Sequence, residues 1–171
     1  ARLDPEEFRA CFLSWVQAVM RVTRGQVVAL DGKTVRRSHA RRLGKSAIHM
    51  VSAWAQTNRL VLGQVATEQK SNEITAIPRL IELIDITGCI VTIDAMGCQK
   101  SIVKNIVDRA ADYVIGLKGN QGTLHREVAE FFADAEKTGF RDVQYATAET
   151  IDGEHGRVET RRCFCTSEVD W

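Results

Sequence analysis

Short apolar segments rich in β-branched residues alternate along this chain with segments in which apolar residues recur at every third or fourth position. The first pattern is typical of buried strands and occupies residues 26–31, 47–56, 59–67, 89–94 and 111–120. The second pattern predicts helices at residues 4–22, 73–84, 99–109 and 123–137. A final pair of strands is predicted at residues 143–150 and 157–165.

After the first helix, the order of these segments is three strands, then helix, strand, helix and strand. Only Thr57 and Asn58 separate the second strand from the third, which indicates a tight hairpin. A hairpin-linked meander followed by a βαβαβ unit predicts an α/β protein with a mixed sheet and helices on its faces.

The first predicted helix begins with Asp4 as its N-cap and Pro5 at its first helical position. Its apolar residues form one stripe, which consists of Phe8, Cys11, Phe12, Trp15 and Val16. We therefore expect this helix to pack against another part of the chain. Trp15 and Trp54 are interpreted as core residues, and His49 as a packed residue of a strand.

Composition narrows the class of protein. The chain has 171 residues, enough for one domain with a core or for one domain plus an appendage. Hydrophobic residues make up 44% and charged residues 26%, the balance of a globular protein and not of a disordered one. We find neither an apolar run of membrane-spanning length nor an apolar signal-peptide centre, so we expect a cytoplasmic protein without a membrane partner. The five cysteines lack CxxC spacing, and we assign neither disulfides nor zinc.

Residues 33–45 form a basic run with two lysines, four arginines and no acidic residue. Such a run is commonly a solvated loop. It would also suit phosphate contacts, because clustered guanidinium groups bind phosphate in a bidentate, salt-sensitive way.

Two aspartates end predicted buried strands: Asp31 is followed by Gly32, and Asp94 by Ala-Met-Gly. If their strands are parallel neighbours, both carboxylates emerge at one edge of the sheet, where α/β proteins bind ligands. Divalent cations would offset the repulsion between two carboxylates and could clamp a phosphodiester. The alternative is that each aspartate caps a turn, which the Asp-Gly pair favours for Asp31 taken alone.

Several segments closely resemble the H-repeat-associated insertion-sequence transposases of the DDE class. They are LDGKTVRRSH (30–39), SNEITAIPRLIELIDITG (71–88), TIDAMGCQK (92–100), DYVIGLKGNQGTLHREV (112–128) and HGRVETRR (155–162). The resemblance runs through nearly the whole chain in consistent order. It implies a ribonuclease-H-like core, an N-terminal segment at 1–24, the first part of that core at 25–120, and a helix with the start of a β-insertion at 121–171.

The resemblance also implies DNA strand cleavage and transfer in bacterial transposition, driven by two Mg²⁺ or Mn²⁺ ions. The family's first two acids map onto Asp31 and Asp94. Its third acid, a glutamate on a late helix, has no counterpart in this sequence, because neither Glu154 nor Glu159 lies in that context. We therefore expect the chain to correspond to the N-terminal part of a transposase.

The expected partners are transposon-end and target DNA, with a homodimer as a further expectation. The candidate DNA-binding residues are Lys33, Arg36, Arg37, Arg41, Arg42, Lys118, Asn120 and Arg157. For each of them a solvated or turn-forming role is the alternative, and residues 70–73 are interpreted first as helix-capping groups. Two other functions stay open: a catalytically inactive DNA-binding or self-associating remnant, and a ribonuclease-H-like nuclease unrelated to transposition.

Overall fold

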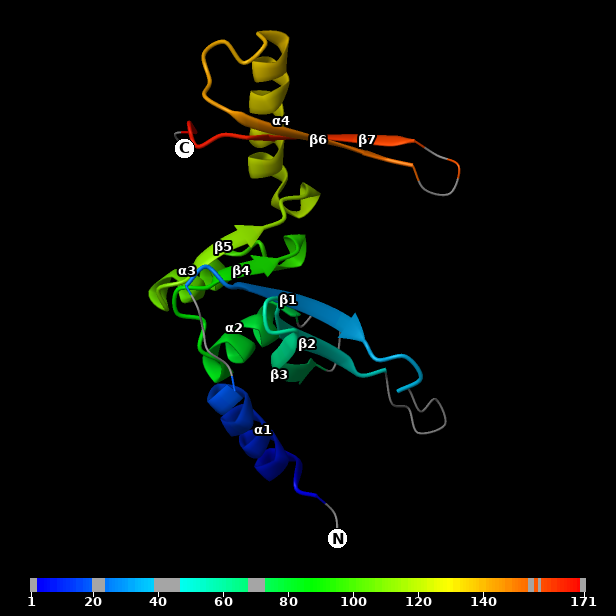
Figure 1. Ribbon diagram of the computed structural model, residues 1–171, viewed down its shortest axis with the longest axis vertical. Helices are drawn as coiled ribbons and strands as arrows, with labels where there is room; N and C mark the ends of the chain where they lie inside the picture. The colour runs from blue at the N-terminus through cyan, green and yellow to red at the C-terminus, as the bar shows by residue number, and fades with distance from the viewer. Residues whose placement is uncertain are drawn as a thin grey trace. The chain divides into compact units, whose positions relative to one another are not determined.

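The computed structural model describes residues 3–19, 24–38, 47–67, 73–153, 156 and 158–169 (Figure 1). The chain divides into two compact units, Ala1–Gln121 and Gly122–Trp171. The elements of the first unit are, in chain order, α1 (Pro5–Val19), β1 (Val27–Thr34), β2 (His49–Ala55), β3 (Leu60–Thr67), α2 (Glu73–Leu83), β4 (Ile90–Ile93), the 3₁₀ turn η3 (Ala95–Gly97), α3 (Lys100–Asp108), β5 (Asp112–Ile115) and the 3₁₀ turn η4 (Gly119–Gln121).

The first unit is built on a five-stranded mixed sheet with the strand order β3-β2-β1-β4-β5. β1, β2 and β3 form an antiparallel meander, while β4 runs parallel to β1 and β5 runs parallel to β4. Parallel neighbours need a crossover connection, and the chain supplies one with α2 and the next with α3. The predicted fold class, an α/β protein with a ribonuclease-H-like mixed sheet flanked by helices, is confirmed.

The core lies on the face of the sheet that α2 and α3 cover. α2 packs on β2 and β3, and α3 packs on α2 and β5 (Figure 1). Alternate residues of the strands point into this core, together with one side of each helix. The most buried of them include Val28, Val51, Ala53, Leu62, Leu80, Ile81, Val91, Ile102 and Ile106, each with an exposed fraction of 1% or less.

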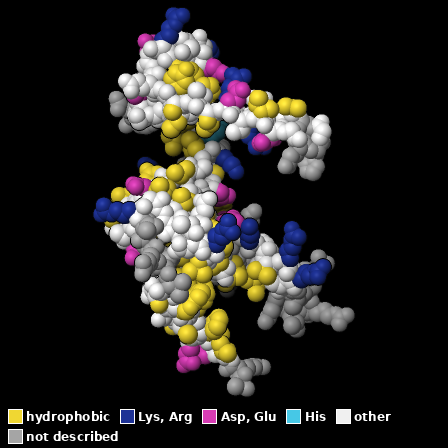
Figure 2. Space-filling model, viewed as in Figure 1, with side chains coloured by type: hydrophobic (Ala, Val, Ile, Leu, Met, Phe, Trp, Pro, Cys, Tyr) yellow, Lys and Arg dark blue, Asp and Glu magenta, His cyan; other side chains and the backbone are white. Residues whose placement is uncertain are grey.

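Trp54 and Trp15 lie outside this core, so their interpretation as core residues is wrong. Trp54 alternates with the buried Ala53 and Ala55, and its side chain is therefore on the opposite face of the sheet, where 40% of it is exposed. In α1, Val16 is buried and Phe12 partly buried, but Trp15 is 51% exposed. The apolar stripe of α1 is wider than the part that the core covers, and Figure 2 shows hydrophobic side chains on the surface over this helix.

β1 is longer than the sequence predicts. Its parallel pairing with β4 ends at Leu30, but its antiparallel pairing with β2 continues to Thr34, which pairs with His49. Asp31 and Gly32 are therefore strand residues, and the reading of this dipeptide as a turn is wrong. The backbone hydrogen bonds to β2 keep the chain extended past the aspartate.

The second unit consists of α4 (Gly122–Lys137) and an antiparallel pair, β6 (Ala146–Asp152) and β7 (Glu159–Cys165). Its small core contains Ala135 and an aromatic cluster of Phe140, Tyr145 and Phe164. In this cluster, the ring centre of Phe140 lies 4.4 Å from that of Tyr145 and 4.8 Å from that of Phe164. Every residue of β6 is exposed.

Candidate active site

The two predicted aspartates lie at equivalent positions along two neighbouring parallel strands. Leu30 of β1 is the register partner of Ile93 of β4, and Asp31 and Asp94 are the residues that follow them. Leu30 and Ile93 are buried in the core, whereas both aspartates are exposed. Because side chains alternate along an extended chain, both carboxylates extend from the face of the sheet opposite to α2 and α3, on strands about 5 Å apart.

Asp31 pairs with a lysine on its own strand. Its Oδ2 lies 3.2 Å from Nζ of Lys33, which is two residues further along β1 and therefore on the same face of the sheet. The two side chains are 60% and 83% exposed. An ion pair that solvent reaches this freely contributes little to stability, so the Asp31 carboxylate stays accessible to another cation.

Asp94 caps the 3₁₀ turn η3. Its backbone is still extended, with φ −72° and ψ 177°, and Oδ1 accepts a hydrogen bond of 3.0 Å from the backbone N–H of Met96. The capping role that we set beside the metal role is thus present for Asp94. One oxygen is used in this contact, which leaves the second free of this hydrogen bond and fixes the direction of the carboxylate.

The residues that follow β5 donate hydrogen bonds to η3 and to the residues beside it. Gly116 follows β5, and its N–H donates to the carbonyl of Ile93 at 3.0 Å. A Cβ at Gly116 would lie 3.2 Å from the backbone nitrogen of Ala95, so this close approach favours glycine. Nδ2 of Asn120 donates to the carbonyl of Ala95 at 2.7 Å, and Nε2 of Gln121 donates to that of Cys98 at 2.6 Å. The structure therefore gives the amide nitrogen of Asn120 a partner within the fold.

His49 and Glu73 form a buried polar pair near the end of β1. The sequence did not predict this pair. Nε2 of His49 is 2.5 Å from Oε1 of Glu73, and the two side chains are only 3% and 8% exposed. Nδ1 of His49 lies 3.0 Å from the hydroxyl oxygen of Thr34. The prediction that His49 is a packed residue is confirmed. Glu73 begins α2 but faces inward, and only the three-dimensional pairing reveals its contact with His49.

The remaining candidate DNA-binding residues are exposed where the structure describes them. Arg36 and Arg37 form the turn after β1, and Lys118 lies between β5 and η4. Figure 2 shows lysine and arginine side chains on the surface over the end of β1 and the turn that follows it. Three further candidates, Arg41, Arg42 and Arg157, lie outside the described residues.

Among the described residues, no group of three or more histidine, cysteine, aspartate or glutamate side chains is placed to hold a metal ion. Within the part of the chain that the structure describes, the candidate donors are therefore the two carboxylates of Asp31 and Asp94. Exposed carboxylate oxygens fit Mg²⁺ or Mn²⁺, which accept hard oxygen ligands and retain several water molecules. Two carboxylates separated by no more than the general strand spacing of about 5 Å would repel each other by about 1 kcal/mol in water and about 3 kcal/mol at an effective dielectric constant of 20. A cation between them would remove this repulsion.

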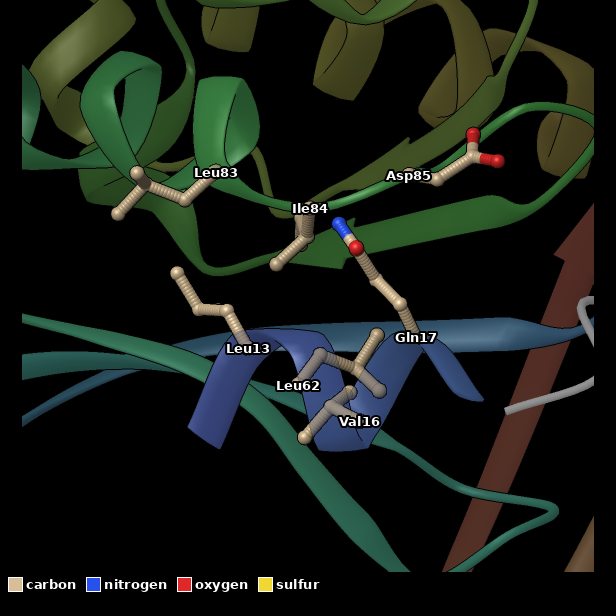
Figure 3. Close-up of a pocket in the computed structure, with 7 residues that line it drawn as sticks. All are labelled: Leu13, Val16, Gln17, Leu62, Leu83, Ile84 and Asp85. Atoms are coloured by element: carbon tan, nitrogen blue, oxygen red, sulfur yellow. The ribbon is translucent and has the colours of Figure 1, made fainter. Parts of the chain in front are cut away.

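An apolar cavity of about 300 Å³ lies between α1 and the region that connects α2 with β4. Leu13 and Leu83 extend into it from α1 and α2, Val16, Leu62 and Ile84 also line it, and Gln17 and Asp85 lie at one side (Figure 3). None of the residues that line it belongs to the strand ends that carry Asp31 and Asp94. Separately, none of the described helices is both long and apolar enough to span a membrane.

A five-stranded mixed sheet in the order β3-β2-β1-β4-β5, with β1 antiparallel to β2 and parallel to β4, defines the ribonuclease-H-like class of fold. Residues 23–162 match the family model described as the transposase DDE domain, and the chain belongs to this family. The resemblance to insertion-sequence DDE transposases that the sequence predicted is thereby confirmed.

Named relatives agree with this assignment. The transposase-family protein YncI of Escherichia coli O157:H7 is 44% identical over 179 residues, which cover 100% of this chain and 45% of YncI. The H repeat-associated transposase-family protein YhhI of Escherichia coli K12 is 41% identical over 159 residues, which cover 93% of this chain and 41% of YhhI. This chain thus spans less than half the length of both proteins.

Among solved structures, the piggyBac transposase in a synaptic complex with hairpin DNA is 12% identical to this chain. Its TM-score is 0.43, and the match covers 77% of this chain and 29% of the piggyBac protein.

Proposed function

We propose that this chain supplies part of the active centre of a metal-dependent DNA transposase, in which Asp31 and Asp94 bind the divalent cations. The observation that carries the proposal is the register of β1 and β4, which brings two accessible carboxylates to one step of the sheet. Membership of the transposase DDE domain family supports DNA as the substrate. The expected reaction is phosphodiester cleavage and strand transfer during transposition.

In this proposal each strand-end residue has a distinct task. Asp31 and Asp94 hold the cation from two neighbouring strands, and the N–H of Met96 orients one oxygen of Asp94. Mg²⁺ or Mn²⁺ would supply the Lewis-acid chemistry that activates the attacking water or 3′-hydroxyl and stabilises the leaving oxygen. Lys33 lies beside Asp31, from where its ammonium group would neutralise a DNA phosphate near the cation.

The exposed basic residues are proposed to bind the DNA backbone. Arg36, Arg37 and Lys118 are exposed beyond the ends of β1 and β5, on either side of β4 in the sheet. The same role is proposed for Arg41, Arg42 and Arg157. Asn120 is proposed to contact DNA through its amide oxygen or the second N–H of its amide group, because the first N–H donates to the carbonyl of Ala95. A cytoplasmic location and a homodimer remain predictions.

A strand-cleavage assay tests this function. A labelled DNA duplex with the terminal sequence of the element is incubated with Mg²⁺ or Mn²⁺ and a protein extended to the length of the relatives. Asp94→Asn should abolish cleavage while the circular dichroism spectrum stays native, because the substitution removes the charge but keeps the side-chain shape. Undiminished cleavage by the Asp94→Asn protein would refute the role of Asp94.

A second candidate function is a DNA-binding or self-associating module without catalytic activity. It is favoured by the donor set, since among the described residues no third acidic, histidine or cysteine side chain joins the two aspartates. The same cleavage assay on the 171-residue chain separates the two functions. Robust metal-dependent cleavage by this chain would exclude the inactive module, whereas salt-sensitive DNA binding without cleavage would support it.

A further inference from the structure

The buried pair of His49 and Glu73 occupies an unusual place for two titratable side chains. His49 is a buried residue of β2, and Glu73 is a buried residue of α2. At such positions well-packed apolar residues of similar volume are often at least as stabilising as a buried ion pair. His49 is the register partner of Thr34, and Glu73 is the first residue of α2. The pair thus connects α2 to the last residues of β1, just beyond Asp31.

Glu73 and His49 both lie close to Gly32 of β1. A Cβ placed on Gly32 would lie 2.5 Å from both Cδ and Oε1 of Glu73 and 2.9 Å from Nε2 of His49. A side chain at this position would force Glu73, His49 or the strand to shift, because the carboxyl and imidazole groups lie directly against the backbone of Gly32. Gly32 in turn is the residue that follows Asp31.

We propose that Glu73 and His49 are positioning residues for Asp31. They support the backbone of Gly32 from the helix-covered face, while the Asp31 carboxylate extends from the opposite face of the same strand. The His49–Thr34 contact prevents the imidazole from moving away, and the His49–Glu73 contact does the same for the carboxyl group. The distance between the backbone of Gly32 and the side chains of Glu73 and His49 sets the position of Asp31 relative to Asp94.

This inference rests on the proposed cation site. A metal titration shows whether the cation site itself is wrong or only the positioning role of Glu73 and His49. Free Mn²⁺ is measured by electron paramagnetic resonance as it is added to the 171-residue chain, at a temperature where circular dichroism reports native protein. Asp31→Asn should abolish most of the Mn²⁺ binding. The difference from the wild type then gives the part of the Mn²⁺ binding that depends on the proposed site. Gly153→Ala serves as the matched glycine control, because a Cβ there meets nothing within 4 Å.

Three variants test the support itself. Gly32→Ala pushes the strand away from the pair and should weaken Mn²⁺ binding about tenfold, within the range for groups that orient metal ligands. Glu73→Ala removes the support and should weaken binding by a similar factor. Glu73→Gln keeps the side-chain volume and a hydrogen bond to His49, and it should restore the dissociation constant to within about threefold of the wild type.

The double variant Gly32→Ala/Glu73→Ala adds a test of direct contact. The double variant loses the contact of the new methyl group with the glutamate and keeps the one with Nε2 of His49 at 2.9 Å. Its Mn²⁺ binding should therefore be no weaker than that of Gly32→Ala alone. If Gly32→Ala and Glu73→Ala both bind Mn²⁺ like the wild type while Asp31→Asn does not, the positioning role is overturned. If Asp31→Asn also binds like the wild type, the cation site fails and the inference falls with it. Should Glu73→Ala not fold, wild-type affinity in Gly32→Ala alone overturns the proposal.

Discussion

Leu30 and Ile93 are register partners in parallel strands, and the residue that follows each of them is an aspartate. The two apolar side chains are buried under α2 and α3, so the two carboxylates extend from the opposite face of the sheet. Asp31 and Asp94 are 63 positions apart in the sequence (94 − 31), yet Asp31 lies in β1 and Asp94 directly follows the neighbouring strand β4. The proposed cation site depends on this pairing, and the segments around it supply its support.

Asn120 is expected to stabilise the loop that carries Asp94. Its Nδ2 donates to the carbonyl of Ala95 at 2.7 Å, and Asn120→Ala removes this hydrogen bond. The loss should cost about 1 kcal/mol and should accelerate hydrogen exchange at the amides of Met96, Gly97 and Cys98, measured by mass spectrometry. Lys118→Ala, an exposed change in the same connection, is the control and should leave this exchange unchanged. Unaltered exchange in Asn120→Ala would mean that the side chain does not hold η3.

Adjacent residues of α3 should differ sharply in their contribution to stability. Ile106 is fully buried against α2 and the sheet, whereas Val107 is 54% exposed. Ile106→Ala should lower the free energy of unfolding by about 2–5 kcal/mol, because it removes buried methyl and methylene groups and leaves a cavity. Val107→Ala should lower it by less than about 1 kcal/mol. Urea titration checks both values, and equal losses would contradict the assignment of the buried face of α3.

Asp85 should make the stability of the first unit depend on pH in the acid range. The backbone N–H of Thr87 donates to Oδ1 of Asp85 at 2.9 Å, and this bond and a second one from the Thr87 side chain lower the pKa of the carboxyl group from its model-peptide value of 3.8. The folded state therefore binds its proton less readily than the unfolded state does. The resulting stabilisation is present above pH 3.8 and is lost as the pH falls through the lower pKa of the folded state.

Thermal unfolding at several pH values checks this. Asp85→Asn should lower the melting temperature at pH 7, and the difference from the wild type should shrink toward pH 3. Thr87→Ala keeps the backbone donor and removes only the side-chain donor, so it should give a smaller effect of the same sign. A difference between Asp85→Asn and the wild type that stays constant with pH would contradict the lowered pKa.

Periodicity and strand-end chemistry predicted much of this fold. The five strands of the sheet, their hairpin and the helices between them follow from patterns within about ten residues, which local sequence encodes directly. Asp31 and Asp94 could be chosen because each follows a buried apolar run and because parallel strands end at one edge. The hairpin around Thr57-Asn58 was likewise predicted, but its connection has four residues, 56–59, and not two, because β2 ends at Ala55 and Ala55 pairs with Leu60.

Other features needed contacts between distant segments. The length of β1 past Asp31 is decided by β2, because only its hydrogen bonds make Asp-Gly a strand rather than a turn. Trp54 was assigned to the core from its apolar character, but a strand residue can face either side of a sheet. Glu73 and His49 are 24 residues apart, and no sequence motif predicts their contact.

The sequence by itself determined where most strands and helices form and which two carboxylates follow buried apolar runs. These properties are local, since they depend on side-chain periodicity and on the residues that end each element. Only the tertiary structure decided that Asp31 and Asp94 share one step of the sheet, that Asn120 and Gln121 hold η3, and that Glu73 and His49 rest on Gly32. Each of these is a contact between segments far apart in the chain, and strand register and helix packing set its distance.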